Sequence, residues 1–173
     1  MNKTAFLDRD GVINKERGDY TWRIDDFEVN DGVVEGLKKL QQSGFLLIIV
    51  SNQSGIAKGV YGHEDVEKIN QYIFDFFHKN NIEITEIYYC PHHNEIGLCL
   101  CRKPGSLMLE KAIARYQVDV PNSFLIGDRD RDIDAAESVG VKGIKIQSNS
   151  SIFPFVEKLC DICNHDGNEL YQL

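Results

Sequence analysis

The chain has 173 residues, a length that suits one domain (residues 1–173) with its own hydrophobic core. It carries 27 acidic side chains against 19 Lys and Arg, a formal net charge of −8. This balance argues against a nucleic-acid partner, because such proteins neutralise phosphates with a basic face. No apolar run approaches membrane-spanning length and the N-terminus lacks a signal-peptide pattern, so we expect a cytoplasmic protein without a membrane partner.

Apolar strand candidates alternate with helical patterns along the chain. Near-continuous apolar strands are typical of a parallel sheet that is covered on both faces. The alternation predicts an α/β fold with a doubly wound, mainly parallel sheet. The predicted strands are Thr4–Leu7, Phe45–Val50, Ile84–Tyr89, Ser123–Ile126 and Gly143–Ile146, and the predicted helices are Val33–Gln42, Val66–His78, Leu107–Tyr116, Ile133–Val139 and Phe153–Cys160.

Two acids, Asp8 and Asp10, directly follow the first predicted strand. Residues two apart in an extended chain point to the same side, so both carboxylates would face one small volume. Gly11 would let the backbone turn sharply beside them. Mg²⁺ is a suitable partner because it binds carboxylate and carbonyl oxygens. On this segment alone, an Asp-rich turn that only closes a strand is an equal alternative.

Polar groups also follow the other strands. Ser51-Asn52-Gln53-Ser54-Gly55 follows the second strand, a cysteine-rich loop leading to Arg102-Lys103-Pro104 follows the third, and Gly127-Asp128 follows the fourth. In doubly wound sheets, ligands bind beyond the C-terminal ends of the strands. We therefore expect these segments to meet Asp8 and Asp10 in one pocket suited to phosphate and metal chemistry.

The ordered set Asp8-x-Asp10-Gly11, Ser51, Lys103 and Gly127-Asp128 with Asp132 resembles the haloacid dehalogenase superfamily of phosphatases. The resemblance covers nearly the whole chain and implies a Rossmann-type fold. The chain has no room for the cap domain that many members of this superfamily carry.

Within the superfamily, three runs are similar to the D-glycero-D-manno-heptose 1,7-bisphosphate 7-phosphatases. They are Ser51–Gly59, Cys90-Pro91-His92-His93 and Cys101–Pro104. The histidinol-phosphate phosphatases share a zinc-binding loop, which corresponds to residues 90–101 here, and the Cys-Arg-Lys-Pro run, and the short interval from His92 to Cys99 favours them. Val12, where the superfamily often has Thr, leaves the implied chemistry intact.

The resemblance implies a role for each matching residue. Asp8 would be the nucleophile that forms an aspartyl-phosphate, and Asp10 would be the general acid and base. Mg²⁺ would be held by Asp8, the backbone carbonyl of Asp10, and Asp128. Ser51 would hold phosphoryl oxygens, and Lys103 would place a point charge near Asp8.

Substrate selection would fall to further donors. Arg102 is a candidate for a bidentate grip on a second anionic or hydroxyl group, and Arg129 stands where the heptose family binds substrate. The alternative for Arg129, and the favoured interpretation for Arg131, is pairing with Asp130 or Asp132. Asp132 is otherwise expected to orient Lys103 or a metal-bound water. The remaining substrate-binding candidates are Glu16, Asp19, Asn52, Gln53 and Ser54.

The patterns Cys90-x-His92 and Cys99-x-Cys101 offer four soft ligands, the number of a closed structural zinc site. The spacing is not that of a zinc finger, so the resemblance carries part of this prediction. Zn²⁺ would pin the loop that carries Arg102 and Lys103, and free buried cysteines are the alternative. Three further residues are interpreted as core and tail residues without a metal: Cys160, Cys163 and His165.

These patterns together predict a Mg²⁺-dependent, monomeric phosphatase of a small phosphorylated sugar, heptose 1,7-bisphosphate. Two alternatives stay open. One is a histidinol-phosphate phosphatase, and the other is a non-catalytic, zinc-stapled binding module that retains a phosphatase fold.

Overall fold

Five parallel strands form one sheet in the order β3-β2-β1-β4-β5. The structure is a computed structural model that describes residues 1–165, with side chains described as far as residue 159. The strands are β1 (Thr4–Leu7), β2 (Leu46–Asn52), β3 (Glu86–Cys90), β4 (Phe124–Gly127) and β5 (Lys142–Lys145). The helices are α1 (Val33–Gln42), α2 (His63–Lys79), α3 (Leu107–Tyr116), α4 (Asp130–Glu137) and α5 (Phe153–His165), and two 3-10 turns are η1 (Ile24–Asp26) and η2 (Val120–Asn122).

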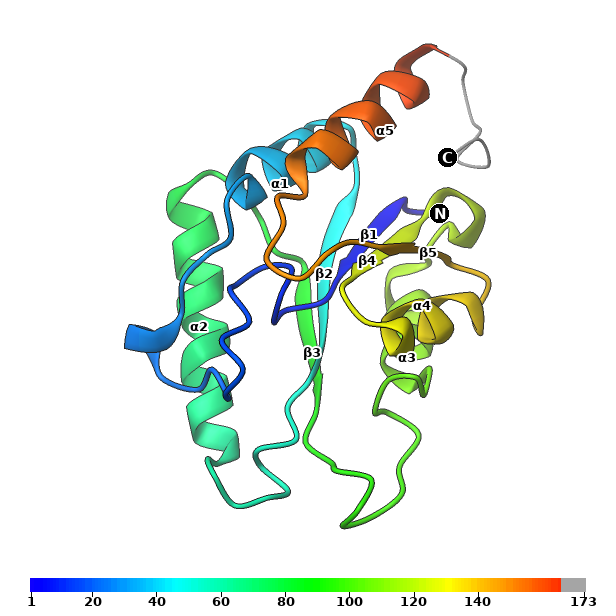
Figure 1. Cartoon of the computed structure of the whole chain (residues 1–173). Helices are drawn as coiled ribbons and strands as arrows, with labels where there is room; N and C mark the ends of the chain where they lie inside the picture. The colour runs from blue at the N-terminus through cyan, green and yellow to red at the C-terminus, as the bar shows by residue number, and fades with distance from the viewer. Residues whose placement is uncertain (166–173) are drawn as a thin grey trace.

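Helices cover both faces of the sheet (Figure 1). Leu7 of β1 packs in a core layer with apolar side chains of α1, α2 and α5, whereas its neighbour Phe6 packs in a second layer with those of α3 and α4. This is the alternation that a strand buried on both faces requires. The doubly wound fold is confirmed, and no cap domain is inserted between the elements of residues 1–165.

Two helices begin three residues earlier than the apolar pattern predicts. In α2, Asp65 accepts a hydrogen bond from the backbone N–H of Gly62, and in α4, Asp132 accepts one from Arg129, both at 3.0 Å. An acid at the third helical position that bonds back in this way supports the first turn. The predicted starts at Val66 and Ile133 were therefore wrong, because apolar periodicity does not register such a polar turn.

β2 and β3 run further toward the site than predicted. Ser51 and Asn52 pair in register with Tyr89 and Cys90, so the sheet itself holds these residues. The interpretation of Cys160, Cys163 and His165 falls on side chains outside the described ones.

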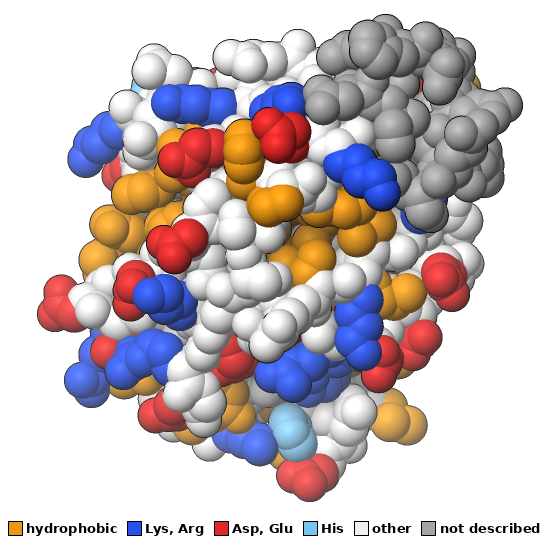
Figure 2. Space-filling model, turned by 45° about the horizontal axis from the view of Figure 1, so that its top comes forward, with side chains coloured by type: hydrophobic (Ala, Val, Ile, Leu, Met, Phe, Trp, Pro, Cys, Tyr) orange, Lys and Arg blue, Asp and Glu red, His pale blue; other side chains and the backbone are white. Residues whose placement is uncertain are grey.

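The surface carries charges of both signs. On the face that Figure 2 shows, acidic and basic side chains are interspersed with hydrophobic ones, and no continuous basic stripe crosses the part drawn in colour. Within residues 1–165, none of the helices combines the length and apolar character that a bilayer crossing needs.

Candidate active site

The C-terminal ends of the strands bring the predicted residues together. Asp8 follows β1, Ser51 lies at the end of β2, and Asp128 follows β4. Because β1 lies between β2 and β4 in the sheet, these three side chains belong to adjacent strand ends.

Lys103 reaches this cluster from the loop after β3. Its Nζ lies 2.8 Å from Asp8 Oδ1 and 2.7 Å from Asp132 Oδ1, and it donates to the carbonyl oxygen of Val50 at 2.7 Å. All three charged side chains are buried. The expected contact between Asp132 and Lys103 is present.

Burial and the sharing of one ammonium by two carboxylates shift the pKa values of Asp8 and Lys103. Burial raises the pKa of Asp8 to about 7, and the lowering effect of Lys103 only partly opposes it. Burial alone would lower the pKa of Lys103, but the carboxylates of Asp8 and Asp132 outweigh it and raise that pKa. Lys103 has two carboxylates beside its single positive charge, whereas Asp8 shares that one ammonium with Asp132.

The surroundings of Asp8 fit a divalent cation. Carboxylate oxygens of Asp8, Asp128 and Asp132 all lie within 4.8 Å of one another. Two cations lie beside these three carboxylates. They are Lys103 and the half-exposed Arg129, whose Nε lies 3.3 Å from Asp128 Oδ2. Asp128 Oδ2 is buried and accepts no hydrogen bond. Hard oxygen ligands with excess negative charge are what Mg²⁺ binds.

Gly11 is required for this arrangement. Its φ of +88° lies in the region that favours glycine, and a Cβ at this position would lie 2.5 Å from Asp128 Oδ2. Any side chain here would displace a candidate metal ligand.

Asp10 is held from one side by its neighbour Arg9. The Arg9 guanidinium is 1% exposed, donates from Nη2 to both Asp10 oxygens at 2.9 and 3.0 Å, and donates to the Thr21 carbonyl at 2.8 Å. Asn14 Nδ2 also donates to Asp10, at 3.0 Å. Sequence reasoning missed Arg9 and Asn14. The signal was present, since a cation placed between two acids in the sequence is expected to pair with one of them.

A cavity of about 120 Å³ opens in front of the two aspartates. Its lining combines carboxylates, side-chain amides and two solvent-accessible arginines, Arg102 and Arg131, which suits a polar phosphorylated ligand. The lining residues are Asp8, Arg9, Asp10, Glu16, Asp19, Tyr20, Thr21, Asn52, Gln53, Ser54, Arg102 and Arg131. Glu16, Asp19 and Tyr20 also line an adjoining hollow of about 370 Å³, together with Gly18 and Arg129.

Of the two arginines at the start of α4, only Arg131 departs from its predicted role. Arg131 was expected to pair with Asp130 or Asp132, but Asp130 pairs with Lys145 and Asp132 with Lys103. Arg131 instead lines the inner cavity. Arg129 pairs with Asp128 and lines the outer hollow.

Asn52 lines the cavity, but its amide is used inside the protein. Its Nδ2 donates to the backbone carbonyl of Lys103 at 3.1 Å, and its Oδ1 accepts from the backbone N–H of Lys103 at 3.0 Å. This clasp joins β2 to the loop after β3 and fixes the backbone from which the Lys103 side chain extends.

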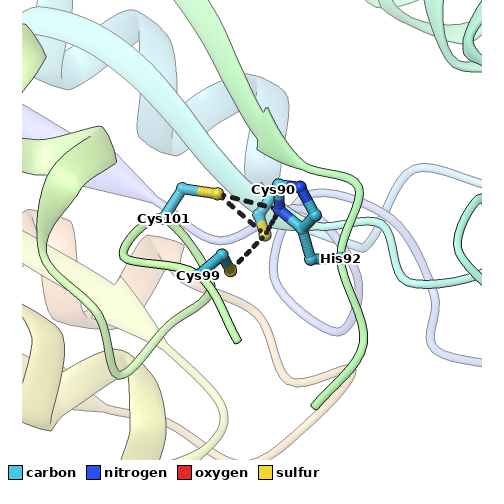
Figure 3. Close-up of side chains that lie close together, drawn as sticks. All are labelled: Cys90, His92, Cys99 and Cys101. Carbon is cyan, nitrogen blue, oxygen red and sulfur yellow. Dashed lines mark hydrogen bonds between the residues drawn. The ribbon is translucent and has the colours of Figure 1, made fainter. Parts of the chain in front are cut away.

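Cys90, His92, Cys99 and Cys101 converge in the loop of residues 90–102, here called the Cys/His loop (Figure 3). Cys90 Sγ lies 3.7 Å from Cys99 Sγ and 3.2 Å from Cys101 Sγ, and His92 Nδ1 lies 3.2 Å from Cys101 Sγ. Thiolates bound tetrahedrally at about 2.3 Å from a zinc ion lie about 3.8 Å apart. The predicted ligands are thus close to the spacing that zinc requires.

The Cys/His loop also holds Arg102. Its backbone N–H donates to Cys99 Sγ at 3.4 Å, and its Nη1 donates to the His92 carbonyl at 3.1 Å. Burial opposes ionisation of Cys99, but hydrogen bonds from the backbone N–H of Arg102 and from the neighbouring cysteines lower the pKa of that thiol.

Comparison with known proteins agrees with this geometry. A family model described as HAD-hydrolase-like matches residues 100–151. A D-glycero-beta-D-manno-heptose-1,7-bisphosphate 7-phosphatase from Vibrio cholerae is 44% identical over 153 residues, covering 84% of this chain and 81% of its own. The D-glycero-alpha-D-manno-heptose-1,7-bisphosphate 7-phosphatase of Photorhabdus laumondii is 39% identical over 146 residues, covering 80% of this chain and 79% of its own.

Solved structures give the same result. A D,D-heptose 1,7-bisphosphate phosphatase from B. bronchiseptica, complexed with magnesium and phosphate, superposes with a TM-score of 0.79 at 27% identity. The match covers 91% of this chain and 86% of that one. The chain therefore belongs to the heptose-1,7-bisphosphate 7-phosphatase family of the haloacid dehalogenase superfamily.

Proposed function

We propose that this protein is a Mg²⁺-dependent phosphomonoester hydrolase that removes the 7-phosphate of D-glycero-D-manno-heptose 1,7-bisphosphate. The observation that carries the proposal is the buried contact of Lys103 with Asp8 and Asp132, beside an Asp128 oxygen that accepts no hydrogen bond. Asp8 of this cluster lines a polar cavity, and the family to which the chain belongs supplies the substrate class.

Asp8 is proposed as the nucleophile. Its carboxylate oxygen attacks phosphorus while the bond from phosphorus to the sugar oxygen breaks, and Asp10 gives its proton to that oxygen. Asp10 then takes a proton from the water that attacks phosphorus, which releases inorganic phosphate and restores the Asp8 carboxylate. Lys103 and the Ser51 hydroxyl hold phosphoryl oxygens, so that the leaving sugar oxygen lies in line with the attacking Asp8.

Asp8, Asp128 and the backbone carbonyl of Asp10 would hold Mg²⁺. The ion supplies charge neutralisation for the transferring phosphoryl group. The clustered carboxylate oxygens of Asp8 and Asp128 support this assignment.

Arg102 and Arg131 are proposed to bind the second phosphate, because both line the inner cavity and a planar guanidinium binds phosphate in a bidentate way. Arg129 would meet the substrate in the outer hollow, and Glu16, Asp19 and Ser54 would meet sugar hydroxyls. Zn²⁺ in the Cys/His loop would be structural, since four protein ligands leave no open position.

A histidinol-phosphate phosphatase is the second candidate. Glu16 and Asp19 in the cavity wall favour it, because they could pair with a cationic substrate. The non-catalytic alternative is not favoured, because Asp8, Asp10, Ser51, Lys103 and Asp128 are all present. That the chain works as a single domain, as a cytoplasmic monomer, and without a nucleic-acid or membrane partner stays a prediction.

Phosphate release from both heptose anomers and from histidinol phosphate, each with and without Mg²⁺, tests the proposal. We expect Mg²⁺-dependent release from heptose bisphosphate with a kcat/KM at least about tenfold above that for histidinol phosphate, the discrimination that one well-placed anion contact of about 1.4 kcal/mol provides. A preference for histidinol phosphate would select the second candidate. No release from any of them would contradict the phosphatase function.

A further inference from the structure

The side chain of Gln53 is committed to contacts within the protein. It is buried, and its Nε2 donates to Asp10 Oδ2 at 3.0 Å and to Ser51 Oγ at 2.7 Å. Its Oε1 accepts a hydrogen bond from the hydroxyl of Tyr61 at 2.8 Å. Both amide hydrogens and the amide oxygen are thus engaged, which fits a positioning role better than the sugar contact expected from the sequence.

Tyr61 determines which way the Gln53 amide faces. If the amide were rotated by 180°, its oxygen would face the Asp10 carboxylate, and two acceptors would meet. The Tyr61 hydroxyl donates to that oxygen on the opposite side and thereby keeps the amide nitrogen toward Asp10 and Ser51.

Tyr61 is itself firmly packed. Its ring is stacked with Trp22 at a centroid distance of 6.2 Å and meets Tyr20 edge-on at 5.7 Å. A Cβ on Gly55 would lie 2.1 Å from this ring, so glycine leaves the space that the ring occupies. Burial raises the pKa of Tyr61 to about 12, so its hydroxyl keeps the proton it donates.

We propose that Tyr61 and Gln53 are positioning residues for the general acid and base. The Tyr61 hydroxyl orients the Gln53 amide, and that amide holds the Asp10 carboxyl group in the position from which it gives its proton to the leaving oxygen. Arg9 also donates to the Asp10 carboxylate, so Gln53 adds to the support of that group. The proposal rests on the proposed phosphatase function but not on the identity of the sugar.

The consequence concerns the first chemical step. As the bond from phosphorus to the leaving oxygen breaks, the Asp10 proton must reach that oxygen. A misplaced Asp10 slows this step strongly when the leaving oxygen is a basic alkoxide, and weakly when it is an acidic phenolate that needs no proton. The dependence on the leaving group distinguishes a positioning role from a general structural one.

The test compares Tyr61→Phe and Gln53→Glu with the wild-type protein, using a sugar 7- or 6-phosphate and p-nitrophenyl phosphate. The parameter is kcat/KM, because it reports the steps up to formation of the aspartyl-phosphate. For the sugar phosphate we expect a loss of roughly threefold to tenfold with Tyr61→Phe, the range for one hydrogen bond. Gln53→Glu places a second acid against Asp10, and we expect a loss on the order of a hundredfold.

On p-nitrophenyl phosphate, Tyr61→Phe is expected to lose less than about twofold, and inhibition by inorganic phosphate is expected to stay within about twofold, because ground-state anion binding does not use the proton. Tyr72→Phe is the matched control, since Tyr72 packs against Phe27 and Phe76 away from the cavity. It is expected to leave both substrates unaffected.

An equal loss on both substrates, or a loss that accompanies weaker phosphate inhibition, would overturn the proposal. Melting temperatures identify a variant that is poorly folded, and the near-isosteric Tyr61→Phe then decides the question. A wild-type protein inactive on both substrates would contradict the phosphatase function, and this proposal with it.

Discussion

Arg102 and Lys103 are neighbours in the sequence, but different parts of the molecule hold them. Lys103 is buried, its Nζ contacts Asp8 and Asp132, and its backbone is clasped by Asn52 of β2. Arg102 is only half-buried, and its backbone N–H and its guanidinium donate to Cys99 and His92 of the Cys/His loop.

This difference indicates that the catalytic groups and the substrate-selecting arginine are supported by different parts of the molecule. The groups proposed to act on phosphorus are held by the sheet, whereas the arginine proposed to recognise the second phosphate is held by the cysteine and histidine cluster. Zn²⁺ was expected to pin both Arg102 and Lys103. The contacts indicate instead that the Cys/His cluster holds Arg102, whereas Lys103 is supported by β2.

Replacing the nucleophile has the largest expected effect. Asp8→Asn removes the attacking carboxylate while keeping its size, so we expect kcat to fall by roughly 10⁴-fold or more on every substrate, as when a nucleophile is lost in other enzymes. Phosphate release measures this, and calorimetry with the bisphosphate checks that binding persists. Asp130→Asn, on the exposed side of α4, is the control. Retained turnover in Asp8→Asn would refute the covalent mechanism.

Lys103→Met is expected to damage reaction and stability together. The change leaves the buried carboxylates of Asp8 and Asp132 without their shared cation, so we expect a loss of about 3–5 kcal/mol in the free energy of unfolding without metal. We expect kcat to fall by roughly 10²- to 10³-fold on monophosphates and bisphosphates alike. Urea unfolding and steady-state kinetics measure both, with the exposed Lys111→Met as control. A loss confined to the bisphosphate would show that Lys103, like Arg102, acts in substrate selection.

Arg102→Ala should affect selection alone. We expect kcat/KM for heptose bisphosphate to fall by about tenfold to a hundredfold, the loss that follows removal of a charge-assisted contact of about 1.5–3 kcal/mol. A sugar monophosphate should change by less than about twofold, because it lacks the second anion. Arg115→Ala, which removes an exposed arginine of α3, is the control. Equal losses on both substrates would place Arg102 in the reaction itself.

Removing the metal from the Cys/His loop should resemble a mild form of Arg102→Ala. Cys99→Ser, or zinc release followed with a chromogenic chelator, frees Arg102 to move without deleting its charge. We therefore expect a loss of roughly threefold to tenfold on the bisphosphate and less than about twofold on the monophosphate, below the effect of losing the arginine. Restoration by added Zn²⁺ is the check. A protein without measurable zinc that keeps its full preference for the bisphosphate would contradict the proposal that zinc holds Arg102 in place.

The sequence was sufficient for the fold and for the residues that meet at the strand ends. Apolar runs identify buried parallel strands, and the ends of such strands share one edge, so Asp8, Ser51 and Asp128 could be placed together before any coordinates. The ligands of the Cys/His loop could be predicted for a similar reason, since few other functions gather three cysteines and a histidine.

The contacts of individual side chains were less predictable. Gln53 and Asn52 lie where a sugar contact is expected, but their amides are used to hold Asp10 and Lys103. Arg131 was expected to pair with a neighbouring acid, because sequence does not show that Lys103 and Lys145 pair with those acids first. Such competition for partners depends on three-dimensional packing.

The clasp of Asn52 on the Lys103 backbone has a consequence for divergence within the family. It isolates the lysine from length changes in the preceding segment, so insertions or deletions between His92 and Cys99 can accumulate without moving the ammonium group. New substrate ranges can therefore evolve by remodelling that segment, while hydrolysis itself is inherited intact.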